Sequence, residues 1–154
     1  MSRRGYTIIE LLMVMIVISI LAGLAILRYI DLRQHAEVAS IVSDLNNVRL
    51  GAYNYWADKN AFPPDAAAGA MPPGMQPYMG NGFRFDNPNY TLDWENFQGP
   101  GGSSGAGGMQ VGIVVTASSS HLLDLLARRT GGSLPFFISG SSVTFILVGP
   151  DGAM

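Results

Sequence analysis

A single carboxylate, Glu10, lies near the start of an apolar run from Tyr6 to Leu27 that has no other charged residue. A charge at bilayer depth costs about 3 kcal/mol, so such a residue is by default a candidate for function. An ion pair with an ammonium group in a low dielectric recovers much of that cost. Glu10 is therefore expected to set the axial register of assembling helices. The alternative is that Glu10 lies near the membrane interface and extends to the lipid headgroups.

The apolar run has the length of a membrane-spanning helix. As a helix, residues 6–27 measure about 33 Å, and the hydrocarbon core of a bilayer measures about 30 Å. Arg3 and Arg4 precede the run, whereas the basic residues after it are offset by Asp31 and Glu37. The positive-inside rule then places the N-terminus in the cytoplasm. We expect a single-pass cytoplasmic (inner) membrane protein with its C-terminal domain outside the cytoplasm.

The helical pattern continues well beyond the apolar run. Between Val38 and Trp56, apolar residues recur at the i, i+3, i+4, i+7 spacing of one helix face. No proline occurs before Pro63, which ends the pattern because proline disfavours the helical region for the preceding residue. One continuous helix is expected from Tyr6 to Asn60, with an apolar first half and an amphipathic second half.

The remaining sequence predicts a small antiparallel sheet, which needs a helix to cover its apolar face. The expected fold class is therefore α+β, with the long helix packed on the sheet. Four large aromatic residues are expected in the core, and two carboxylates are expected on a solvated strand face. The aromatic residues are Trp56, Trp94, Phe136 and Phe137, and the carboxylates are Asp93 and Glu95. The expected strands lie at 90–95, 111–116, 135–139 and 143–148. A helix is expected at 121–130, and loops are expected at 63–82 and 99–108.

Residues 5–12 resemble the cleavage and methylation motif of type IV pilins and type II secretion pseudopilins. In that family a short basic leader ends in glycine, a membrane peptidase cuts after it, and the new N-terminus is methylated. The resemblance implies that Gly5 and Tyr6 form the cleavage site, that Arg3 and Arg4 are the basic residues of the leader, and that Tyr6 is N-methylated. It further implies that Glu10 meets the amine of Tyr6 in a neighbouring subunit.

This resemblance also implies an organisation and a set of partners. Residues 1–5 are the leader, 6–27 the transmembrane and assembly helix, and 28–154 a pilin-like globular domain. The implied partners are identical or related pilin subunits, a prepilin peptidase/N-methyltransferase, an inner-membrane assembly platform, and membrane lipid before assembly. The assembled filament is extracellular or periplasmic. A surface pilus, a secretion pseudopilus and a DNA-uptake fibre all remain open, as does major or minor status.

The sequence departs from the family pattern in two respects. Its first mature residue is Tyr6, where Phe is most frequent. It also lacks the proline in the apolar stretch and the C-terminal disulfide that pilus-forming members often have. These differences favour a pseudopilin or a less typical pilin.

No enzyme site emerges from the other residues. The chain has no cysteine and two histidines, so we expect no metal site, cofactor or catalytic set, and the net charge of −2 does not indicate nucleic acid. Residues 101–105 fit a Gly-x-Ser-x-Gly pattern inside a glycine tract, without the strand and helix that a nucleophile elbow needs. Residues 86–89 offer oxygen ligands without calcium-loop spacing, and Asn89 fits a glycosylation acceptor.

One competing class of function remains. A signal-anchored extracytoplasmic binding module that does not polymerise would use the apolar helix only as a tether. Such a protein would keep residues 1–5 and would be indifferent to Glu10.

Overall fold

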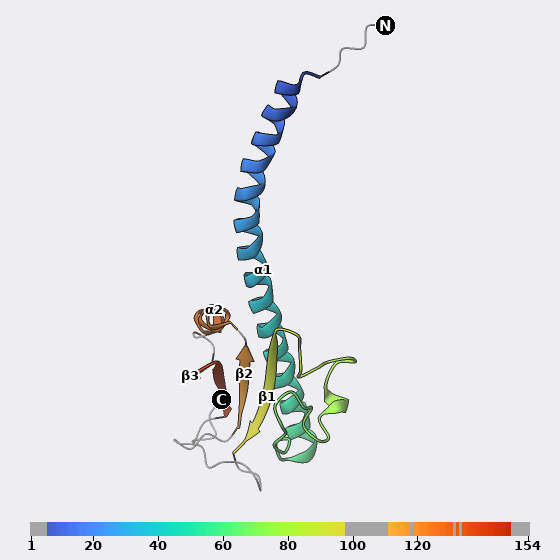
Figure 1. The fold of residues 1–154 in the computed structure, drawn as a ribbon. Helices are drawn as coiled ribbons and strands as arrows, with labels where there is room; N and C mark the ends of the chain where they lie inside the picture. The colour runs from blue at the N-terminus through green and yellow to red at the C-terminus, as the bar shows by residue number, and fades with distance from the viewer. Residues whose placement is uncertain (1–5, 98–110, 118, 131, 133, 149–154) are drawn as a thin grey trace. The chain divides into compact units, whose positions relative to one another are not determined.

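The computed structural model describes residues 6–97, 111–117, 119–130, 132 and 134–148, and the chain divides into two compact units, 1–37 and 38–154. The expected α+β fold is confirmed, with a long helix and a four-stranded antiparallel sheet (Figure 1). The elements in chain order are α1 (Ile8–Lys59), a 3-10 turn η1 (Gln76–Tyr78), β1 (Tyr90–Asn96), β2 (Val111–Ala117), α2 (Ser120–Thr130), β3 (Phe136–Ser139) and β4 (Ser142–Val148).

Helix α1 is the long helix that the sequence predicts, although it begins two residues later than expected. It ends at Lys59 because Asn60 adopts the left-handed conformation, with φ of 54°. The Asn60 amide still donates to the carbonyl of Trp56, at 2.7 Å. A left-handed residue that follows the last turn is a common helix stop, and Asn tolerates it better than most residues do.

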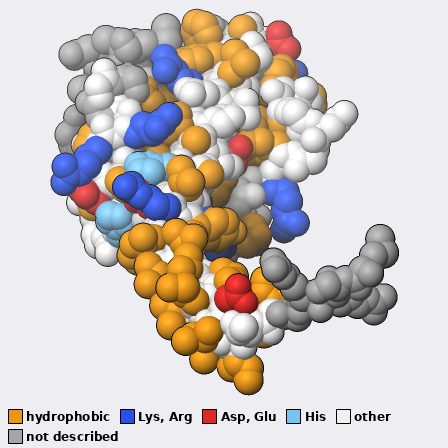
Figure 2. Space-filling view, turned by 90° about the horizontal axis from the view of Figure 1, so that it is seen from above, with side chains coloured by type: hydrophobic (Ala, Val, Ile, Leu, Met, Phe, Trp, Pro, Cys, Tyr) orange, Lys and Arg blue, Asp and Glu red, His pale blue; other side chains and the backbone are white. Residues whose placement is uncertain are grey.

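Within the first unit, α1 exposes apolar side chains all round. Ile8 is 80% exposed, Leu27 is 68% exposed, and the large apolar residues between them are all more than half exposed. Figure 2 shows hydrophobic side chains covering this part of the molecule, with acidic atoms among them. By length and composition this helix can cross a membrane. The first unit therefore fits a membrane anchor.

The sheet of the second unit has the strand order β1-β2-β4-β3. Strand β1 pairs with β2 so that Trp94 lies opposite Ile113, and β2 pairs with β4 so that Ile113 lies opposite Phe145. Strand β3 forms a hairpin with β4 through Gly140, whose φ of 59° suits the tight connection. All four strands lie close to the expected ranges, so these predictions are confirmed.

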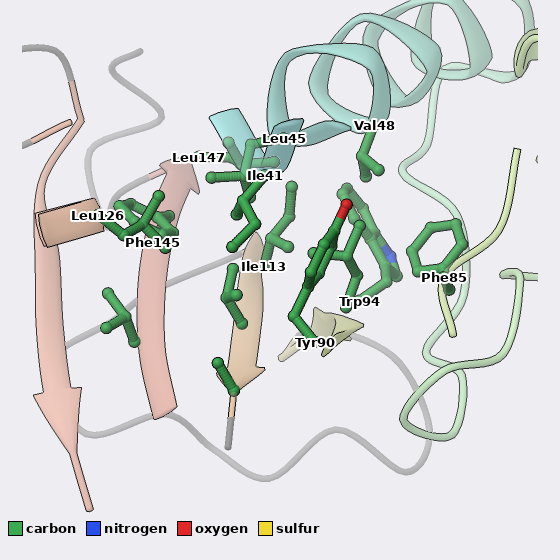
Figure 3. Close-up of a cluster of buried hydrophobic side chains, with 14 of the residues drawn as sticks. Ile41, Leu45, Val48, Phe85, Tyr90, Trp94, Ile113, Leu126, Phe145 and Leu147 are labelled. Atoms are coloured by element: carbon green, nitrogen blue, oxygen red, sulfur yellow. The ribbon is translucent and has the colours of Figure 1, made fainter. Parts of the chain in front are cut away.

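One face of the sheet forms the core together with α1 and α2. Figure 3 shows Ile41, Leu45 and Val48 of α1 directed at the sheet, and Leu126 of α2 close to Phe145. These five side chains are all at most 5% exposed. Val38 begins the part of α1 that belongs to this core, so the amphipathic half of the helix has the packing role that its sequence predicts.

The chain after α1 is fastened to β1 by buried hydrogen bonds. The Pro63 carbonyl accepts from Trp94 Nε1 at 3.1 Å and from Asn96 Nδ2 at 2.8 Å. Further along the loop, Met75 and Met79 pack against α1 at Gly51, where a Cβ atom would lie 2.5 Å from the Met79 sulfur. The loop that the sequence predicts at 63–82 is thus held firmly against α1 and β1.

Two of the four aromatic residues expected in the core are not buried there. Trp94 is fully buried and Phe136 packs at the edge of the core, as expected. Trp56 is 46% exposed because it lies in the last turn of α1, where it stacks on Phe62 with ring centroids 6.3 Å apart. Phe137 is 42% exposed because it lies on the outer face of β3, an edge strand.

Candidate functional site

The first turn of α1 contains a reciprocal set of hydrogen bonds between Thr7 and Glu10. The amide and the hydroxyl of Thr7 both donate to Glu10 Oε2, each at 3.0 Å. The amide of Glu10 donates to the Thr7 hydroxyl oxygen, at 3.3 Å. This arrangement is a capping box, in which an N-cap Thr and a Glu three residues later satisfy each other's backbone donors.

The capping box gives Glu10 a role in the isolated chain that the sequence analysis did not anticipate. The signal was present in the sequence, because Thr-x-x-Glu before an apolar run is the usual signature of such a box. A carboxylate near a helix N-terminus also interacts favourably with the helix dipole. Glu10 is therefore not simply an unpaired charge before assembly: Oε2 is occupied, while Oε1 accepts no hydrogen bond from the described residues.

Of the other residues of the predicted processing site, the structure describes only Tyr6. Tyr6 is 82% exposed and precedes the first turn of α1. Gly5, Arg3 and Arg4 lie outside the described residues. The cleavage site, the methylation site and the register role of Glu10 stay predictions.

The described residues form no metal site, and the candidate calcium ligands at 86–89 belong to a turn. Asp86 forms a bridge with Thr91, and Asn87 Nδ2 donates to the Arg84 carbonyl at 3.2 Å, so this segment is a turn that leads into β1. No group of three or more His, Cys, Asp or Glu side chains suitable for a metal ion occurs in the described part of the chain. The Gly-x-Ser-x-Gly pattern at 101–105 lies outside that part.

The carboxylates of β1 are less solvated than the sequence predicts. Asp93 and Glu95 are half-buried on the outer face of the sheet, and Oδ1 of Asp93 is buried with no hydrogen-bond partner among the described residues. Burial raises the pKa of the Asp93 carboxyl above its ordinary value, and the charge of Asp65 adds to the rise. Burial likewise raises the pKa of Glu95, followed by the charges of Asp93 and Asp65.

Comparison with known protein families identifies the N-terminal segment. Residues 1–26 match the family described as the prokaryotic N-terminal methylation motif. This motif is the signal of type IV pilins and pseudopilins, so the resemblance seen in residues 5–12 is confirmed. The chain therefore carries a pilin-type processing signal in front of an α+β fold, which supports a type IV pilin-like, processed protein. No curated protein and no solved structure matches the chain.

Proposed function

We propose that this protein is a structural subunit of a type IV pilus-like filament or a type II secretion pseudopilus. A prepilin peptidase removes residues 1–5 and methylates Tyr6, and an inner-membrane assembly platform then polymerises the subunit through α1. Before assembly, lipid surrounds the apolar half of the helix, and the C-terminal domain lies outside the cytoplasm. The chain then acts mechanically rather than as an enzyme.

The observation that carries this proposal is the methylation motif at residues 1–26, which continues directly into an exposed apolar helix. A tether needs an apolar helix but no processing signal. A filament subunit needs both, because cleavage creates the free amine and the apolar surface supplies the packing area between subunits.

The geometry of Glu10 suits a role in register. Thr7 holds one carboxylate oxygen inside the first turn, and the other oxygen accepts no hydrogen bond from the described residues, so it can accept one from a neighbouring subunit. The methylated amine of Tyr6 in a neighbouring copy is such a donor. An ammonium–carboxylate pair in lipid is strongly favoured over an unpaired carboxylate, so it selects one axial stagger among many apolar packings.

Intact-mass measurement of the membrane-extracted chain tests the processing step. The proposal expects a mature chain that starts at Tyr6 and carries one added methyl group. Gly5→Ala is expected to leave the chain at full length, because a Cβ atom at the scissile position hinders the peptidase. An unprocessed wild-type N-terminus would contradict the proposal and favour a signal-anchored binding module.

A second experiment tests polymerisation separately. Glu10→Ala should still insert into the membrane and be processed, yet the association constant between subunits should fall about tenfold, or about 1.4 kcal/mol, which is seen as a lower filament yield. Leu11→Ala is the matched control, because it changes the neighbouring position without removing a charge. Normal filament yield from the Glu10→Ala chain would refute the register role while leaving processing intact.

A further inference from the structure

A polar pocket lies between the middle of α1 and the loop that leads into β1, entirely within the second unit. Its volume is about 440 Å³, and it is open to solvent. On the helix side it is lined by Ser40, Asp44 and Asn47, which follow one another at helical spacing. On the loop side it is lined by residues 80–84 and by Asn87. A pocket of this size is large enough for a small ligand.

The walls of this pocket are held in place before any ligand binds. The hydroxyl of Tyr90, another lining residue, donates to Asp44 Oδ2 and thereby connects β1 to α1. The amide of Phe83 donates to the Gly80 carbonyl at 3.1 Å, which closes a tight turn. The ring of Phe83 also packs edge-on against Phe85, which is 2% exposed in the core. A preorganised wall loses little entropy on binding.

The side chains of the pocket combine donors and acceptors at close range. Asn47, Asn81 and Asn87 each carry a carboxamide, which offers an acceptor oxygen and a donor NH₂ group. Asp44 adds acceptors, and Arg84 adds donors. A hydroxyl group both donates and accepts, so adjacent hydroxyls of one ligand are best matched by this kind of mixed lining.

The pocket carries no net formal charge. Asp44 and Arg84 contribute opposite charges that cancel, so a neutral ligand is matched as a whole better than a charged one. The partly exposed ring of Phe83 supplies apolar surface in an otherwise polar site, which suits the C–H face of a sugar ring, whereas the ring of Tyr90 is buried in the core. We propose that this pocket is a binding site for a neutral carbohydrate of about disaccharide size. The proposal does not depend on polymerisation.

Titration of the full-length chain with sugars tests this assignment. The ¹⁵N-labelled protein is held in dodecylphosphocholine micelles, because the common maltoside detergents would themselves occupy a sugar site. Maltose, lactose and N,N′-diacetylchitobiose are each added up to about 10 mM, a range suited to millimolar affinity. Saturable amide shifts are expected with at least one of them, confined to residues 40–47 and 80–90.

Matched variants locate the binding. Asn47→Ala and Asn81→Ala should each weaken the affinity about tenfold, since each removes hydrogen bonds to the ligand. Asn54→Ala is the control, because Asn54 is an exposed residue on the same helix outside the pocket lining. Spectra outside the pocket report that each variant is folded.

Several outcomes would overturn the assignment. One is the absence of a saturable response to all three disaccharides. Another is an equal loss of affinity in Asn47→Ala and Asn54→Ala. A response of the same residues to calcium chloride or inorganic phosphate, without a response to sugar, would assign the pocket to an ion instead.

Discussion

At the scale of single residues, Glu10 has one role that the structure shows, helix capping, and one that the proposal adds, helix register. Its Oε2 accepts both hydrogen bonds from Thr7, which completes the first turn of α1. Its Oε1 accepts no hydrogen bond from the described residues, and the proposal assigns this atom to the amine of a neighbouring subunit. Thr7 restricts the rotamers of the carboxylate, so in the proposed assembly it is a positioning residue.

The role of Thr7 can be measured in the monomer. Thr7→Ala removes a helix cap worth about 1 kcal/mol, so amide hydrogen exchange at residues 9–11 should become about fivefold faster in micelles. Thr7→Ser keeps the hydroxyl and should restore slow exchange. If Ser and Ala variants exchange alike, the capping box does not stabilise this turn.

Asp93 makes the stability of the second unit depend on pH. Because its folded pKa and that of Glu95 are raised, the native state holds these protons more tightly than the unfolded chain does. The stability that these two carboxyls contribute is therefore fully present below their ordinary pKa values of 3.8 and 4.5. It is lost as the pH rises through their raised pKa values in the folded state. Other carboxylates act in parallel, so the effect is read from a variant.

Asp93→Asn isolates this contribution. The variant should be more stable than wild type at pH 7, by less than about 1 kcal/mol because solvent screens a half-exposed group. The gain should shrink on acidification toward pH 4. Urea unfolding followed by tryptophan fluorescence at both pH values checks this expectation, and a gain that is equal at both would contradict it. Asp86→Asn, at an exposed position before β1, is the control.

At the scale of elements, the amphipathic half of α1 holds the second unit together. Ile41 is fully buried, so Ile41→Ala should lower the free energy of unfolding by about 2–5 kcal/mol through lost burial and a cavity. Leu50→Ala on the same helix should change it by no more than about 0.5 kcal/mol, because Leu50 is 61% exposed. Similar losses in both variants would show that this half of α1 does not dock as described.

The elements were largely predictable because their signals are local. Helical periodicity predicted α1, alternation and β-branched runs predicted the strands, and Ser, Arg and Gly around residues 120–131 predicted α2. The exposure of Trp56 and Phe137 was not predictable, because it depends on where the last turn of α1 and the edge strand β3 lie in the assembled sheet. Burial of Asp93 likewise depends on tertiary neighbours that composition does not reveal.

The candidate site was predictable in part. The position of Glu10 in an apolar run and the glycine before Tyr6 both pointed to the processing motif, which the family match confirms. The Thr-x-x-Glu spacing of Thr7 and Glu10 is itself a sequence signal for the capping box that the structure shows. The polar pocket beside Asp44 could not be predicted from the sequence, because its lining residues on α1 and on the loop are more than thirty positions apart.

At the scale of the whole molecule, the two units differ in how they bury apolar side chains. The second unit buries its own apolar core, whereas the first unit exposes large apolar side chains from Ile8 to Leu27. No described residue covers that surface. The proposal assigns lipid to the stored subunit and neighbouring helices to the assembled one.

Cysteine cross-linking between copies tests the register claim most directly, because the natural chain has no cysteine. If Tyr6 of one copy meets Glu10 of the next, neighbouring helices are offset by four residues, about 6 Å. Chains that carry Ile8→Cys should then cross-link to differently tagged chains that carry Leu12→Cys, and Ile8→Cys should not cross-link to Ile16→Cys. Cross-links between identical positions only, or none in filaments that form normally, would contradict the account.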